Sequence, residues 1–142
     1  MGALADMVRQ HKAKAFDKAD MIVKETITTF GGRLVKEWTP LGDPLLWKSP
    51  PPADYRPGNL QSSWFYAPNR PSTETTEATN DRRVHGLDRL PASALGVRHY
   101  LSNNAPHAMP IERGHSSQAP NGILWSAMEF EPMVRTLSKA MP

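Results

Sequence analysis

The chain has 142 residues, which by length is one domain, and a domain of this size supports a single modest core. It contains no cysteine, which excludes disulfides and thiolate metal sites. Its net charge of +3 is spread along the chain and not clustered, which argues against a dedicated nucleic-acid binder.

The first residues carry no recognisable targeting signal. They lack the apolar run of a signal peptide, and no apolar segment of the chain is long enough to span a bilayer. The start Met1-Gly2 resembles a myristoylation site, but Asp6 stands where that motif has Ser or Thr. We therefore expect a soluble protein made or assembled inside a cell, without a membrane partner.

Residues 1–38 are predicted to form a helical arm, with the helix itself over 3–38. Apolar residues recur there at steps of three and four, and most lysines fall on the other face. Threonines and a glycine pair near residues 29–32 are weak helix formers and predict a bend or break, followed by a short continuation to Glu37. Thr39-Pro40 should end the helix, because the residue before proline avoids the helical region.

Residues 39–58, TPLGDPLLWKSPPPADYRPG, are predicted to form a long proline-rich loop. Its prolines exclude a helix interior and a central strand. The loop nevertheless carries Leu45, Leu46, Trp47 and Tyr55, and an apolar loop of this length is more often functional than a spacer. Two interpretations of Trp47 stay open: an anchor in a contact with another subunit, or a lid on the local core.

Residues 59–101 are predicted to hold antiparallel strands. The alternation in NLQSSWFYA, residues 59–67, indicates a first strand with Trp64 in the core. Residues 68–91 are interpreted as an exposed insert, because their first half is almost entirely polar. The segment GVRHYLS, residues 96–102, is the better candidate for a later strand.

Residues 102–142 are predicted to contain a turn, a loop and a C-terminal helix. A short helical stretch around 108–113 should end with Gly114 as its C′ residue. An apolar stripe over 122–139 predicts the closing helix, which Pro132 interrupts and kinks. A strand at 122–126 is the alternative.

The segment IERGHSSQAPNG, residues 111–122, poses a chemical question, because Ser116 follows a glycine and a histidine. A hydrolase elbow needs G-x-S-x-G between a buried strand and a helix, and here the second glycine is missing. A polar loop whose side chains cap backbone amides is the favoured interpretation, and we expect no enzymatic activity. The alternative is a small serine hydrolase that uses Ser116 with His115 or His107.

The sequence predicts neither a metal nor a cofactor. The five histidines are widely spaced, and the pair Glu112 and His115 falls short of the three or four ligands that zinc requires. The glycines around Arg33 and His115 match neither phosphate-binding loop pattern.

Two stretches carry a resemblance to a known family: TPLGDPLLWKSPPPADYRPGNLQSSWFYAPN (residues 39–69) and HYLSNNAPHAMPIERGHSSQAPNGILWSAMEFEPMV (residues 99–134). Together they are similar to neck proteins of tailed bacteriophages of the tail-completion, or tail-terminator, type. That family shows a TP-V/L-G-x-P-x-L-W-K-S-P loop after a long helix. It later shows Y-L-x-N-x-x-P-Y-A-x-x-I-E-x-G-x-S-x-Q-A-P-x-G-M.

The resemblance covers the chain from about Val35 to Val134, with three departures. His107 stands where the family usually has tyrosine, Ile123 where it has methionine, and residues 71–91 have no counterpart. The matching residues are Thr39, Pro40, Trp47, Lys48, Ser49, Pro50, Gly58, Leu60, Trp64, Tyr100, Leu101, Asn103, Pro106, Ala108, Ile111, Glu112, Gly114, Ser116, Gln118, Ala119, Pro120 and Gly122.

The resemblance implies an α+β fold in which a long N-terminal helix and a C-terminal helix pack on a small antiparallel sheet. It implies a homo-oligomeric ring, commonly a hexamer, that joins the tail tube to the head connector in the virion neck after assembly in the host cytoplasm. DNA would pass through the ring without specific binding. A non-viral interaction adaptor is the alternative. Candidate contact residues are Leu45, Leu46, Trp47, Lys48, Tyr55, His107, Glu112, His115 and Gln118.

Overall fold

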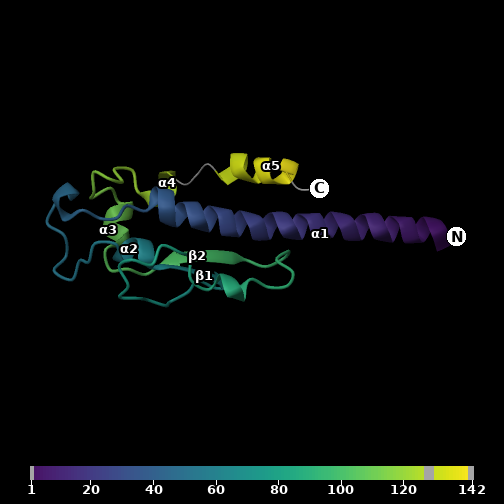
Figure 1. The fold of residues 1–142 in the computed structure, drawn as a ribbon, viewed down its shortest axis with the longest axis horizontal. Coiled ribbons are helices and arrows are strands. Elements are labelled where there is room, and N and C mark those ends of the chain that lie inside the picture. Colours follow the sequence, from purple (N-terminus) through teal and green to yellow (C-terminus); the bar gives the residue numbers. More distant parts are fainter. Residues whose placement is uncertain (1, 127–129, 141–142) are drawn as a thin grey trace.

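The computed structural model describes residues 2–126 and 130–140 and has the predicted α+β fold: a long N-terminal helix, a two-stranded antiparallel sheet and a short C-terminal helix (Figure 1). In chain order the elements are α1 (Gly2–Arg33), a π-helical turn (Leu34–Trp38), a 3-10 turn (Pro44–Leu46), α2 (Asn59–Ser62), β1 (Trp64–Pro68), a second 3-10 turn (Leu87–Arg89), β2 (His99–Asn103), α3 (Ala108–Glu112), α4 (Ile123–Ser126) and α5 (Phe130–Ala140).

Helix α1 is the middle layer of the molecule, with the sheet on one side and α4 and α5 on the other (Figure 1). Only its second half is packed in this way. Every residue from 2 to 17 is exposed, and this free half projects past the rest of the protein (Figure 1). In the part of the chain that the structure describes, no helix is long and apolar enough to cross a membrane.

The bend or break predicted near residues 29–32 is wrong. Helix α1 runs through both glycines, and its hydrogen-bond pattern changes only at the π-helical turn 34–38. At Gly31 a Cβ would be 2.9 Å from Cγ2 of Val84, so the missing side chain lets the sheet side approach closely, whereas a Cβ at Gly32 would meet nothing within 4 Å. Helix packing therefore outweighs local propensity at this position.

The π-helical turn ends at Thr39, as predicted from Thr39-Pro40. The Thr39 backbone N–H and hydroxyl both donate to the Leu34 carbonyl, at 3.0 and 2.6 Å. The hydroxyl oxygen accepts from Nε1 of Trp64 at 2.9 Å, and the Thr39 carbonyl accepts from Nε2 of Gln61. One buried threonine thus joins the helix end to the start of the sheet.

The strand predicted over residues 59–67 is half wrong. Residues 59–62 form helix α2, which begins after Gly58 in the left-handed conformation, and the strand starts at Trp64. The Asn59 side chain accounts for the turn, because its Nδ2 donates to the carbonyls of Thr76 and Ala78 and so pulls in the incoming insert. The polar and apolar residues that alternate over 59–62 are therefore part of a helix and not of a strand.

Strand β1 pairs with β2 in antiparallel register, with Tyr66 opposite Leu101, which confirms the later strand predicted at GVRHYLS. The other edge of β1 is bridged by His85, whose backbone bonds with Trp64 and Tyr66 at 2.9 and 2.8 Å. Both faces of β1 are covered, since residues 64–67 are all buried. The buried core comprises Leu34, Val35, Leu60, Trp64, Tyr66, Val84, Ala105, Ile111, Ala119 and Ile123.

Most residues of the insert 68–91 are exposed, but the insert is attached to the body and enters the core. Val84 is buried beside Gly31 of α1. Arg89 forms a two-bond ion pair with Glu74 at 2.7 and 2.9 Å, and that hydrogen bonding lowers the pKa of Glu74 to about 2. Asn104 adds a bond from its Nδ2 to the Ser72 carbonyl.

The chain is helical on both sides of residues 127–129, as α4 and α5, and not a strand at 122–126. Residues 127–129, where a continuous closing helix would join, lie outside the described residues. Pro132 falls in α5. Helix α5 packs along α1, across from the sheet, so its main contact is α1 and not the sheet as the resemblance implied (Figure 1).

Candidate functional site

The proline-rich loop is docked on the segment IERGHSSQAPNG, more than sixty positions further along the chain. Trp47 and Ser116 form an antiparallel bridge. On either side of it, the Lys48 N–H donates to the His115 carbonyl at 2.8 Å and the Ser117 N–H donates to the Leu46 carbonyl at 2.9 Å. The two segments that carry the family resemblance therefore meet as a short stretch of sheet.

Three ring side chains pack together behind this bridge. The Trp47 and Tyr55 rings are 5.0 Å apart and nearly perpendicular, and the Tyr55 and His107 rings are 4.8 Å apart. The Tyr55 hydroxyl donates to the Gly42 carbonyl, and burial raises the pKa of this tyrosine. Trp47 also packs against the core cluster, so the structure supports the interpretation of Trp47 as a lid on the core.

His107 was predicted as a contact residue between subunits, but the structure places it inside the chain. Its side chain is buried, with 3% of the residue exposed, and Nε2 has no hydrogen-bond partner. Burial lowers the pKa of His107, opposed by the nearby Asp54 carboxylate. The residue is an aromatic packing element in the place where the resemblance expects tyrosine.

This burial predicts an acid sensitivity. Because the pKa of His107 is lower in the folded than in the unfolded protein, its contribution to stability is complete above about pH 6.5. The contribution should be lost as the pH falls through the folded pKa, because the unfolded chain takes up the proton first. Urea unfolding at several pH values should show this, and the slope of stability against pH should be shallower in His107→Phe.

Glu112 also has an intramolecular role. Its Oε2 accepts hydrogen bonds from the Ile123 and Leu124 N–H groups, at 2.8 and 3.1 Å, and so caps the start of α4. Gly122 makes this possible, because a Cβ there would lie 2.4 Å from the Glu112 carbonyl oxygen. Gly114, the predicted C′ residue of α3, has φ of +78° as that role requires.

The geometry gives the hydrolase alternative no support. Ser116 is buried, with 1% of the residue exposed, and its hydroxyl oxygen accepts the Gln118 N–H. The Gln118 side chain in turn accepts from the Asp43 N–H at 3.2 Å, so it ties the two loops together within one chain. In residues 2–126 and 130–140, no group of three or more His, Asp or Glu is placed to hold a metal ion.

Five candidate contact residues lie on the surface of the docked loops, and Gln118 is one of them. Leu45 is 89% exposed at the tip of the proline-rich loop, and Leu46 beside it is 40% exposed. Lys48 and His115 are exposed as well, and they pair through backbone atoms. Leu45, Leu46, Lys48 and His115, here called the exposed tip, thus lie in two loop segments joined by backbone hydrogen bonds, and Leu45 is free of the core.

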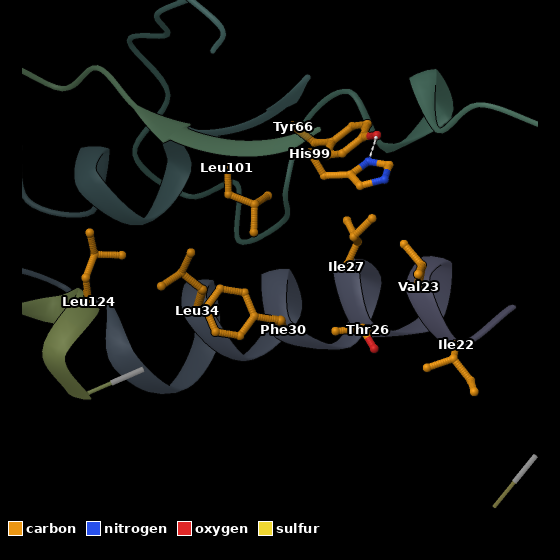
Figure 2. Close-up of a pocket in the computed structure, with 10 residues that line it drawn as sticks. All are labelled: Ile22, Val23, Thr26, Ile27, Phe30, Leu34, Tyr66, His99, Leu101 and Leu124. Atoms are coloured by element: carbon orange, nitrogen blue, oxygen red, sulfur yellow. Dashed lines mark hydrogen bonds between the residues drawn. The ribbon is translucent and has the colours of Figure 1, made fainter. Parts of the chain in front are cut away.

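The largest feature that sequence reasoning missed is an apolar groove along the second half of α1 (Figure 2). It has a volume of about 570 Å³, and its described lining contains no Asp, Glu, Lys or Arg. Its lining residues are Ile22, Val23, Thr26, Ile27, Phe30, Leu34, Tyr66, His99, Leu101 and Leu124. The helix forms one wall and the sheet faces it across the groove (Figure 2).

The polar groups that β1 and β2 bring to this groove satisfy each other. His99 Nε2 lies 2.9 Å from the Ala94 carbonyl, which can only accept, so Nε2 carries the proton. Nδ1 then accepts from the Tyr66 hydroxyl at 2.8 Å (Figure 2). On α1, the Thr26 hydroxyl is buried without a hydrogen-bond partner. The spacing of apolar residues over 22–34 could have indicated the α1 wall of the groove. It could not have indicated the sheet residues that face this wall.

Comparison with known proteins gives no relative for this chain. No protein-family model matches it, and neither the curated proteins nor the solved structures contain a significant match.

Proposed function

We propose that this chain is a structural protein of the neck of a tailed bacteriophage. In this proposal it is a tail-completion or tail-terminator protein whose copies form a ring, commonly of six, between the tail tube and the head connector. It would reside in the virion after assembly in the host cytoplasm, and it would catalyse no reaction.

One observation carries the proposal: the two motif-bearing loops dock on each other through the Trp47–Ser116 bridge. Residues shared with the family motif make this arrangement. Glu112 caps α4, Gly114 ends α3 and Gln118 accepts from the proline-rich loop. Motif residues that contact one another in the fold support the family resemblance better than two separate stretches of similar sequence do.

The exposed tip suits a ring subunit. A closed ring requires each copy to present two different surfaces, one to each neighbour. The tip formed by Leu45, Leu46, Lys48 and His115 offers one such surface on a loop held by backbone hydrogen bonds, so little conformational entropy is lost on docking. A net charge of +3 is compatible with DNA that slides through without strong phosphate binding.

Native mass spectrometry and electron microscopy of the purified protein test the proposal. We expect ring-shaped oligomers, and we expect the protein to join phage tail or connector preparations in a sedimentation assay. A strictly monomeric protein that joins neither preparation would contradict the proposal.

A further inference from the structure

We propose that the free half of α1, residues 2–17, seats its apolar face in the α1 groove of a second copy of this chain. The proposal names the partner of the groove, and it rests on the proposed function only for the requirement that copies repeat around a ring.

The free half carries apolar side chains that the rest of the described chain leaves uncovered. Leu4 is 71% exposed, and Met7, Val8 and Phe16 are each 56–57% exposed. A helical segment of this length is only marginally stable in water without a packing partner. A row of exposed apolar side chains on a projecting helix is typical of a surface that binds another protein.

The free half repeats the face that lines the groove. Leu4 and Val8 precede Ile22 and Thr26 by one constant interval of about five α-helical turns, so these four residues share one side of α1. In the second half of the helix this side borders the groove, with Ile22 and Thr26 directed away from the sheet (Figure 2). In the first half the same side faces solvent.

The lengths of the apolar row and of the groove wall also match. The apolar row from Leu4 to Phe16 spans about 18 Å, as does the groove wall from Ile22 to Leu34. Several of the charged side chains of the free half, including Asp6, lie on the other face and would stay in water. Arg9 and Lys12 are on the apolar side, and their long stems can lie along the groove with the charged groups at the rim.

The groove is better suited to a helix than to a small ligand. It is a trough open along α1, with Leu124 of α4 at one end and the sheet facing the helix (Figure 2). Its sheet-side polar groups, Tyr66 and His99, are already paired. A helix laid along α1 would lie beside it as α5 does, which is how neighbouring helices associate in bundles.

Because the donor and the acceptor are different surfaces of one chain, each copy would give one helix end and receive one. Such a head-to-tail contact produces a closed ring when the rotation between copies closes, and a filament when it does not. The contact repeats at every copy, so it is the kind of interface a ring subunit needs.

Val8→Asp tests the inference, with Gln10→Asp as its matched control. Both residues are exposed on the free half and both changes add one negative charge, but Gln10 lies on the face away from the apolar row. We expect Val8→Asp to raise the dissociation constant between copies at least about tenfold, and Gln10→Asp to leave it unchanged. The measurement is native mass spectrometry across protein concentrations, with helix content checked by circular dichroism.

Cross-linking gives an independent measurement, because the natural chain has no cysteine to interfere. Protein with Val8→Cys is mixed with protein carrying Ile27→Cys and treated with a short bismaleimide. We expect a cross-linked pair in this mixture and little with Gln10→Cys in place of Val8→Cys. Equal yields, or equal effects of the two aspartate variants, would overturn the inference.

The outcomes also separate this inference from the proposed function. If Val8→Asp forms rings as the unchanged protein does, the exchange of helix ends is wrong and the neck proposal stands. If the exchange is observed but the protein joins neither tails nor connectors, the neck proposal fails and the self-association remains.

Discussion

Replacing Trp47 with alanine should destabilise the isolated subunit by about 3 kcal/mol, the low end of the range for a truncated core tryptophan, because Trp47 is only partly buried. The side chain packs on the core cluster and on the rings of Tyr55 and His107, so its removal opens a cavity and leaves two aromatic neighbours uncovered. Urea unfolding of the monomer measures the loss.

Leu45→Ala is the matched control, because Leu45 lies two positions away in the same loop but is 89% exposed. We expect it to change monomer stability by less than about 0.5 kcal/mol. If Trp47 is instead an anchor for a neighbouring subunit, Trp47→Ala will weaken ring formation and leave the urea midpoint of the monomer where it was. That result would contradict the position that the structure gives this side chain.

Replacing Gly114 with alanine should cost about 2–5 kcal/mol, from backbone strain together with steric overlap. Gly114 has φ of +78°, and a Cβ there would lie 2.3 Å from the Pro120 carbonyl oxygen. A backbone atom cannot rotate away as a flexible side chain can. The turn that holds Ser116 and Gln118 against the proline-rich loop should therefore loosen.

Gly96→Ala separates the two causes of this loss, backbone strain and steric overlap. Gly96 has φ of +73°, but no atom lies within 4 Å of its added Cβ, so only the strain of about 1–2 kcal/mol remains. Thermal unfolding of both variants gives the comparison. Equal losses would mean that the close approach to Pro120 contributes nothing and that the tightness of this turn is overstated.

The parts of the fold with a strong local signal could be predicted from the sequence. The long first helix, the short helix before Gly114 and strand β2 each have a periodicity or a terminating residue of their own. Helix α2 could not be predicted, because four residues are too few to distinguish a helical repeat from alternation. Its cause lies in the Asn59 bonds to Thr76 and Ala78 far along the chain.

Some features of the candidate site could likewise be predicted from the sequence, and others could not. The exposed leucines of the proline-rich loop were identified from sequence, because apolar residues in a proline-rich segment are unusual. His107 was a candidate contact with a partner, and Glu112 a candidate contact within or between subunits; the structure buries the first and uses the second as a helix cap within the chain. Both roles depend on partners brought together by the fold. The groove was missed because its two sides come from α1 and from strands formed much later in the chain.

The projecting half of α1 is a continuous helix, so a change in its tilt displaces its far end. From Gly2 to Lys18 it is about 24 Å long, so a tilt of about 10° at its base moves its end by about 4 Å. Few contacts set that tilt, chiefly the pairing of Lys24 with Asp20 and the bonds of both side chains to residues 92–94. Small adjustments at the base of this helix end would therefore displace Leu4 and Val8 by several ångströms relative to the rest of the protein.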